Sequence, residues 1–329
     1  MDMISEVAKA RQGAGSGIKN PFKMSLMQRR EARWGLFFIS PWLIGFFIFY
    51  LAPMIASLVF SLFDFTLSAP EEAKFVGLTN WRRMLFEDPN TWISLGVTFR
   101  FAVISFPIGM ITSFGLALLL NSKHLVGRNF FRTFFYAPTM VPGIAAILIW
   151  VQVLNPNTGW LNRLIEMTGI TAMGQNGLRW LDDPGLIYIA YTFIGLWGIG
   201  NTILIYLAVL HGVPTELYEA AEIDGAGYWR RLVNITVPMV TPIIFYNLVL
   251  SVVGLLQYFL VPWILNLGNG YPEGTTRFYM IYFYKQAFTF QNMGYGAALA
   301  WLLFIVALII TIFLFATARY WVYYAGEQK

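Results

Sequence analysis

The stretch WGLFFISPWLIGFFIFYLAPMIASLVFSLF, residues 34–63, contains no charged side chain. A helix needs roughly 20 apolar residues to cross the hydrocarbon core of a bilayer, so this run is long enough to span it. Further uncharged runs occupy residues 101–122, 133–154, 186–210, 240–265 and 297–318. The sequence therefore predicts an all-α membrane protein with six transmembrane helices.

The composition agrees with a membrane protein and excludes several other classes. Hydrophobic residues make up 57% of the chain and charged residues 12%, about half the usual share for a soluble domain. The net charge is +5, but the basic residues lie at the ends of the spans, so we expect no nucleic-acid partner. With no cysteine and two histidines, the chain offers no thiolate or histidine cluster, and we expect no catalytic residue and no metal site.

The distribution of Lys and Arg predicts the orientation, because cytosolic loops are enriched in both. The polar segment 1–33, the second and fourth loops and the C-terminus carry fourteen, against eight in the longer loops on the other side. We therefore expect residues 1–33 to be a cytosolic tail, residues 34–329 to form the membrane domain, and both termini to be cytosolic. Residues 64–96 and 266–296 are expected outside.

The sequence contains neither of two features that would let the chain drive transport by itself. None of the six runs contains Asp, Glu, Lys or Arg, whereas proton-coupled carriers place such groups at membrane depth. No GxxxxGK[ST] motif occurs, so any ATP, with its Mg²⁺, must be bound by another chain. The alternative is a self-sufficient six-span channel or facilitator for a neutral solute. A membrane-embedded enzyme is a weaker possibility, because no paired acids or Ser-His pair lie at membrane depth.

The loop HGVPTELYEAAEIDGAGYWRRLVNITVP, residues 211–238, is the richest acidic segment on the expected cytosolic side. Pro214 and Thr215, followed by acids, are typical of the start of a helix. Gly225 and Gly227 are typical of its end. By composition alone, such a helix could be only a solvated connector, or it could dock a closely packed partner.

The spacing in this loop resembles the EAA motif of ABC importer permeases. The matching residues are Glu219, Ala220, Ala221, Asp224, Gly225, Ile235 and Pro238, with Val237 where leucine is usual. In that family the short helix couples the membrane domain to the ATP-binding subunit. Its flanking words, VPTELYEAA, DGAGYWRRL and ITVPMVTP, resemble the sugar-permease branch, which includes the maltose and glycerol-phosphate permeases.

This resemblance implies a type I ABC importer transmembrane domain in a bacterial-type cytoplasmic (inner) membrane, with no cofactor of its own. It also implies four kinds of partner: a second homologous permease, two ATP-binding cassette subunits, an extracytoplasmic solute-binding protein and a carbohydrate substrate. The chain would then be a transport subunit, not an enzyme, and its partner would hydrolyse the ATP.

Small and amide-bearing residues in the fourth and fifth spans are candidates for the substrate site. Trp197 and Asn201 are four apart, which on a continuous helix places them on one face. The fifth span carries Gly254, Gln257 and Tyr258, expected in the middle of a helix. The resemblance points to Gly198, Asn201, Gly254 and Tyr258, and the pattern adds Gln257. Packing between helices is the alternative role for all of them.

Overall fold

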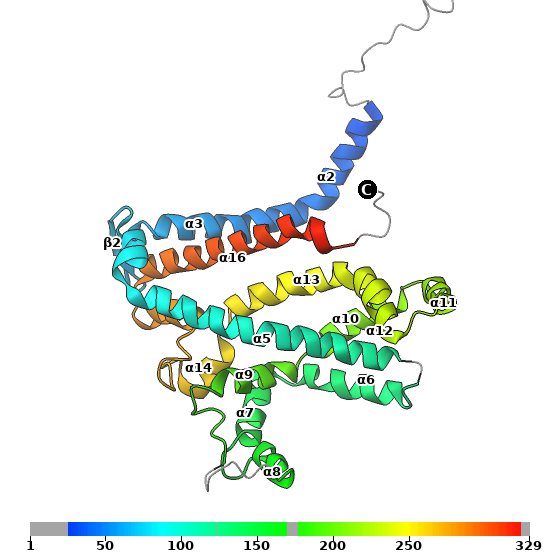
Figure 1. Cartoon of the computed structure of the whole chain (residues 1–329). Coiled ribbons are helices and arrows are strands. Elements are labelled where there is room, and N and C mark those ends of the chain that lie inside the picture. The colour runs from blue at the N-terminus through cyan, green and yellow to red at the C-terminus, as the bar shows by residue number, and fades with distance from the viewer. Residues whose placement is uncertain (1–25, 123, 170–176, 324–329) are drawn as a thin grey trace, which may run out of the picture. The chain divides into compact units, whose positions relative to one another are not determined.

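The computed structural model describes residues 26–122, 124–169 and 177–323 (Figure 1). The chain divides into two compact units, Met1–Ser57 and Leu58–Lys329. Most of the predicted tail, residues 1–25, lies outside the described residues, but residues 26–33 are already helical. The first helix therefore begins several residues before the uncharged run at 34–63.

The first span is one nearly continuous helix. It consists of α2 (Leu26–Phe46), the π-helical segment η1 (Phe47–Leu51) and α3 (Ala52–Phe60). Together, residues 29–60 are long and apolar enough to cross a membrane. Pro41 lies inside α2, where a membrane helix tolerates it because neighbouring groups can satisfy the freed carbonyl.

The remaining spans are either long helices or bent helix pairs. Long helices cover 89–121, 228–266 and 293–321, while two pairs bend by 108° between 140 and 143 and by 58° between 196 and 200. The described part of the chain thus holds four spanning helices, or six if each bent pair is one span. The elements are β1 (Phe63–Thr66), β2 (Ala69–Phe75), α4 (Thr79–Arg82), η2 (Arg83–Glu87), α5 (Pro89–Asn121), α6 (Arg128–Tyr136), η3 (Ala137–Met140), α7 (Gly143–Val153), α8 (Trp160–Met167), α9 (Ile187–Leu196), α10 (Gly200–His211), α11 (Thr215–Ile223), α12 (Tyr228–Arg231), η4 (Leu232–Thr236), α13 (Val237–Leu256), α14 (Leu260–Asn266), α15 (Tyr279–Tyr284), η5 (Lys285–Thr289) and α16 (Met293–Trp321).

A small antiparallel hairpin, β1 with β2, follows the first span and was not predicted. Asn80 fixes its first strand by donating to the carbonyl oxygens of Ser61, at 3.0 Å, and Phe63, at 2.9 Å. The start of α16 approaches the same strand, and a Cβ on Gly294 would lie 1.8 Å from the Phe63 carbonyl oxygen. Only glycine fits at this contact.

A polar cluster around Asp88 links the start of α5 to α15 and α16. One Asp88 carboxylate oxygen accepts hydrogen bonds from the Tyr282 hydroxyl and, at 2.6 Å, from the Tyr295 hydroxyl. The other oxygen accepts from the Asn90 amide at 3.0 Å. Partial burial raises the pKa of Asp88, but these hydrogen bonds outweigh it and hold that pKa below its ordinary value. We call Asp88, Tyr282 and Tyr295 the Asp88 cluster.

The helix α5 runs through the second unit, and loops far apart in sequence gather at its two ends. In Figure 1 the turn from α5 to α6 lies at the same end as α11 and α12, while β2 lies at the other end. The amide of Tyr323 donates to the Thr241 hydroxyl at 2.9 Å, which brings the end of α16 to the start of α13. Alternate loops thus share one end, as a six-span chain requires.

Candidate functional site

The fourth span breaks where the sequence predicts one helical face. The helix α9 ends at Leu196 and α10 begins at Gly200. Trp197 and Asn201 therefore do not sit on one continuous helix, and that expectation was wrong. Gly200 allows close packing at the break, because a Cβ there would lie 2.6 Å from the Phe135 carbonyl oxygen.

The fifth span also breaks at its predicted site residues. The helix α13 ends at Leu256, Gln257 caps it, and Tyr258 is outside any helix. The mid-helix placement of Gln257 and Tyr258 was therefore wrong. Tertiary packing explains the break, because the Tyr258 ring centroid lies 4.5 Å from that of Phe101 and 5.1 Å from that of Phe278.

A cavity of about 280 Å³ lies among α5, α9, α10 and α13, beside the break in the fourth span. We call it the central cavity. Of the predicted substrate residues, Gly254 lines it, and Gly198, Asn201, Gln257 and Tyr258 do not. The lining residues are uncharged: Ser105, Phe106, Gly109, Met110, Ser113, Thr192, Gly195, Leu196, Ile199, Thr202, Tyr206, Asn247, Ser251, Gly254 and Leu255.

Two buried polar side chains of the central cavity are left without hydrogen bonds. Tyr206 on α10 and Asn247 on α13 are both buried and lie near each other. Neither the Tyr206 hydroxyl nor the Asn247 amide nitrogen makes a hydrogen bond of accepted geometry with the described residues. By contrast, the Thr192 hydroxyl already donates to the Tyr188 carbonyl at 2.7 Å. Tyr206 and Asn247 lie close to each other without a hydrogen bond of good geometry, so both side chains keep hydrogen-bonding capacity that a polar ligand can use.

The predicted short helix in the 211–238 loop is confirmed as α11, Thr215–Ile223. Its C-terminus forms a Schellman motif, in which Ala226 donates to the Ala221 carbonyl at 2.8 Å and Gly225 donates to the Glu222 carbonyl at 3.0 Å. Gly225 has φ +76°, and no other atom lies within 4 Å of its would-be Cβ. The requirement for glycine therefore comes from the backbone conformation and not from lack of space.

Two further contacts tie α11 to the chain that follows it. Glu222 pairs with Arg231 at 3.1 Å, and the Tyr218 hydroxyl lies 2.9 Å from the Thr236 hydroxyl. The seven motif residues then separate into two groups. Glu219, Ala220, Asp224 and Gly225 are exposed and Ala221 is partly exposed, while Ile235 and Pro238 are partly buried. Ile235 packs against the apolar cluster that includes Tyr206.

The same loop also exposes large apolar side chains. Leu217, Ile223, Tyr228, Trp229 and Val233 are all exposed. With the acids of α11 they form a mixed apolar and negative surface, which we call the coupling surface. Contiguous exposed apolar residues on a loop are typical of a protein–protein contact.

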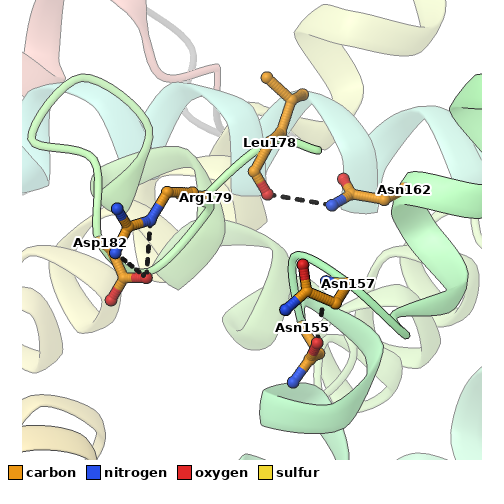
Figure 2. Close-up of polar contacts among 6 residues, drawn as sticks. All are labelled: Asn155, Asn157, Asn162, Leu178, Arg179 and Asp182. Atoms are coloured by element: carbon orange, nitrogen blue, oxygen red, sulfur yellow. Dashed lines mark hydrogen bonds and ion pairs between the residues drawn. The ribbon is translucent and has the colours of Figure 1, made fainter. Parts of the chain in front are cut away.

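Asn162 organises the loops around α8, at the other side of the bent third span. Its amide nitrogen donates to the carbonyls of Pro156, at 2.9 Å, and Leu178, at 3.0 Å, and its oxygen accepts from the Trp180 indole at 2.8 Å. Figure 2 shows the Leu178 contact beside the Arg179–Asp182 ion pair, which measures 3.3 Å. One buried side chain thus joins the turn at 155–159 to the segment 178–180.

Comparison with known proteins places this architecture in a family. The family model described as "Binding-protein-dependent transport system inner membrane component" matches residues 105–325, which include both the central cavity and the coupling surface. The chain belongs to this family. The permease is therefore a multi-pass inner-membrane transport component, and not an enzyme.

Individual relatives match the permease over nearly its whole length. The probable ABC transporter permease protein YesP of Bacillus subtilis (strain 168) is 34% identical over 316 residues, which cover 96% of this chain and 99% of that protein. The trehalose/maltose transport system permease protein MalF of Thermococcus litoralis is 30% identical over 300 residues, covering 90% and 97%. A chain in the crystal structure of a bacterial alginate ABC transporter, in complex with an alginate pentasaccharide-bound periplasmic protein, shares the fold, with a TM-score of 0.72 at 22% identity over 89% of this chain and 97% of that one. The predictions of an ABC importer permease and of its fold class are confirmed.

Sequence analysis missed Tyr206 and Asn247 as residues of the permease cavity, although a signal was present. Asn247, Ser251 and Gly254 follow one another at spacings of four and three, which places them on one face of α13. Thr202 and Tyr206 have the same spacing of four on α10. Small and polar residues at helical spacing in two spans predict a cavity between them.

Proposed function

We propose that this permease imports a carbohydrate, which it binds in the central cavity. The observation that carries the proposal is the pair of buried polar groups on Tyr206 and Asn247, which lie close to each other in an uncharged cavity and make no hydrogen bond of good geometry. A sugar offers hydroxyl groups to such donors and acceptors and C–H faces to apolar walls. Relatives named for trehalose/maltose and for arabinooligosaccharides support the same substrate class.

The energy for import comes from partner subunits in this proposal. A second homologous permease completes the pathway, and two ATP-binding cassette subunits bind ATP and Mg²⁺. One of them docks on the coupling surface, where Glu219 and Asp224 offer carboxylates to a partner arginine. ATP then changes the relative stability of two permease conformations, and the sugar is released because it binds them with different affinity.

The orientation in the proposal follows the charge of the loops. The coupling surface and both termini face the cytosol, and the loops around Asn162 and the β1–β2 hairpin face outward. A solute-binding protein delivers the sugar to this outer side. On α8, Trp160, Leu164 and Met167 are exposed at helical spacing, and the Asn162 hydrogen bonds hold that helix in place.

Four sequence-predicted residues remain secondary candidates for contact with the sugar. Gly198, Gln257 and Tyr258 lie in the two breaks, and Asn201 lies in the first turn of α10, which follows the first break. Broken spans expose backbone groups at membrane depth only where they line a protected cavity or are packed in protein. These residues would meet the sugar in a conformation with a wider cavity.

Two matched tyrosine variants test the proposed site. Tyr206→Phe removes a buried hydroxyl from a residue that lines the central cavity. Tyr258→Phe removes a buried hydroxyl from a ring that packs against Phe101 outside the cavity lining. The assembled transporter, reconstituted with its binding protein, is assayed for sugar-stimulated ATP hydrolysis with a panel of sugars. Losing one hydrogen bond should lower affinity roughly five- to a hundredfold for the sugars that use it.

The proposal predicts an altered ranking of sugars for Tyr206→Phe at normal assembly. Asn247→Leu should do the same, and Tyr258→Phe should change the ranking less, because Tyr258 does not line the central cavity in this structure. If Tyr258→Phe alone changes the ranking, the site lies at the break in the fifth span and not in the central cavity. A uniform fall across all sugars that tracks assembly would contradict both sites.

A further inference from the structure

A second, chemically different pocket lies between the start of α6 and the end of α10. Its volume is about 540 Å³, and it is lined by Leu125, Gly127, Arg128, Asn129, Arg132 and His211. None of these residues lines the central cavity or belongs to α11. We call it the basic pocket. Its ligand must differ from a neutral sugar, because the lining carries two guanidinium groups and an imidazole.

The positive charges of the basic pocket are not neutralised by the described protein. The ion pairs of the described residues are Arg82–Glu87, Arg179–Asp182 and Arg231–Glu222, so neither Arg128 nor Arg132 has a carboxylate partner there. The Nε atom of Arg132 is buried and makes no hydrogen bond with the described residues. Its Nη2 atom reaches only the Nε2 atom of His211, at 3.5 Å. The two guanidinium groups therefore have no counter-ion among the described residues, and an anion with several oxygens would supply one.

The backbone at this pocket is electropositive, as the side chains are. The helix α6 begins after Gly127, at φ +76°, and no side chain caps its first turn. The N–H groups and the partial positive charge at a helix start favour an anion. Two arginines, a histidine and a helix start thus converge, and tetrahedral phosphate matches this set of donors.

The surface beside the pocket favours the phosphate of a lipid over a free phosphate ion. Phe130 and Phe134, four residues apart on α6, are 69% and 61% exposed, and Val126 on the preceding turn is 88% exposed. An apolar helix face next to a cationic pocket is the arrangement of a segment lying at the membrane surface. Anionic lipids of the cytosolic leaflet bind basic pockets of this kind between spans.

We propose that the basic pocket binds the headgroup phosphate of an anionic phospholipid from the cytosolic leaflet. The acyl chains lie along the exposed face of α6 that carries Phe130 and Phe134. The proposal rests on the cytosolic orientation of the 122–132 loop, and it is independent of which solute occupies the central cavity. Because the pocket joins α6 to the end of α10 just before α11, a bound lipid ties the base of the coupling surface to the bilayer.

The test uses the assembled transporter in nanodiscs made with phosphatidylcholine alone or with added phosphatidylglycerol. Native mass spectrometry measures the phosphatidylglycerol that stays bound after release from the nanodisc. The double variant Arg128→Gln with Arg132→Gln should retain at least about tenfold less, since each arginine near the membrane surface contributes about a factor of five. Arg230→Gln, an exposed cytosolic-side arginine outside the pocket and without an ion pair in the described chain, is the control and should retain lipid like the wild type.

Further arms identify the source of the phosphate and the cause of a failure. Inorganic phosphate in excess should not displace phosphatidylglycerol, and displacement would show a free-anion site instead. If the double variant does not assemble, Arg128→Gln alone is used, because Arg128 is exposed and a change there spares the buried contacts of Arg132. Equal lipid retention by wild type and variant, or an equal loss in Arg230→Gln, overturns the proposal. Labelling of Val126→Cys from outside intact cells would show that the orientation, and not the pocket chemistry, is wrong.

Discussion

Gly225 provides a sharp test of the coupling surface, because the backbone conformation at this position, and not lack of space, requires glycine. Its φ of +76° is in the left-handed region, and a Cβ there would meet no atom within 4 Å. Alanine in this region costs about 1–2 kcal/mol. At a tenfold change per 1.4 kcal/mol, the loop conformation described here becomes roughly five- to thirtyfold less favourable in Gly225→Ala.

The assay is binding of the purified ATP-binding subunit to the solubilised permease, followed by sugar uptake in the reconstituted complex. We expect affinity to fall by up to the same factor in Gly225→Ala. Gly225→Asn should be milder, because Asn adopts the left-handed region more readily than other residues with a side chain. A β-branched residue, in Gly225→Val, should be worse than alanine.

Gly227 is the matched control, two residues further along the same loop. Its φ is −68°, and its would-be Cβ also has nothing within 4 Å. Gly227→Ala should therefore bind the ATP-binding subunit like the wild type. Equal impairment of Gly227→Ala and Gly225→Ala, or normal binding by Gly225→Val, would refute the argument from backbone conformation.

Three further changes test other parts of the structure. Glu219→Lys should place a cation on the coupling surface and lower transport at normal membrane insertion, while Glu72→Lys on the β1–β2 hairpin should not; equal uptake by both variants would remove Glu219 from the contact. In the cysteine-free chain, Thr215→Cys should react with an impermeant reagent only in inverted vesicles and Glu72→Cys only in intact cells; the reverse pattern would invert the topology. Asp88→Asn should lower the free energy of unfolding by about 1–3 kcal/mol in thermal denaturation, since two tyrosine hydroxyls lose a charged acceptor. Because folding lowers the pKa of Asp88, the wild type should keep this stabilisation at pH values above the ordinary Asp pKa, near 3.9, and lose it as the pH falls through the lowered pKa. A stability difference between wild type and Asp88→Asn that does not depend on pH would contradict this prediction.

The spans and the short helix α11 were predictable because their signals are local. Runs without charge mark the spans, and Pro214 with Gly225 marks the two ends of α11. The breaks were not predictable from those runs, because hydropathy averaged over a span does not detect an interruption of three residues. They depend on tertiary contacts, such as Gly200 against the Phe135 carbonyl.

The cavity residues and the hairpin were missed for related reasons. The predicted set favoured residues that would be neighbours on unbroken helices, and the breaks at 197–199 and 257–259 end the helical spacing on which that prediction depended. In the sequence, Tyr206 is an ordinary aromatic residue of an apolar helix, and only the structure shows that its buried hydroxyl makes no hydrogen bond of good geometry. The strand β2, APEEAKF, lacks the apolar alternation that normally predicts a strand.

The Asp88 cluster has a consequence for how the permease can move. Two tyrosines on α15 and α16 share one carboxylate at the start of α5, so these three elements resist separation at that end. The fourth and fifth spans, by contrast, are interrupted close to the cavity, where regular helix is lost at 197–199 and 257–259. We therefore expect bending at the two interruptions and not at the Asp88 cluster, which joins three elements. Such bending would change the shape of the cavity while the joined ends of α5, α15 and α16 move together as one body.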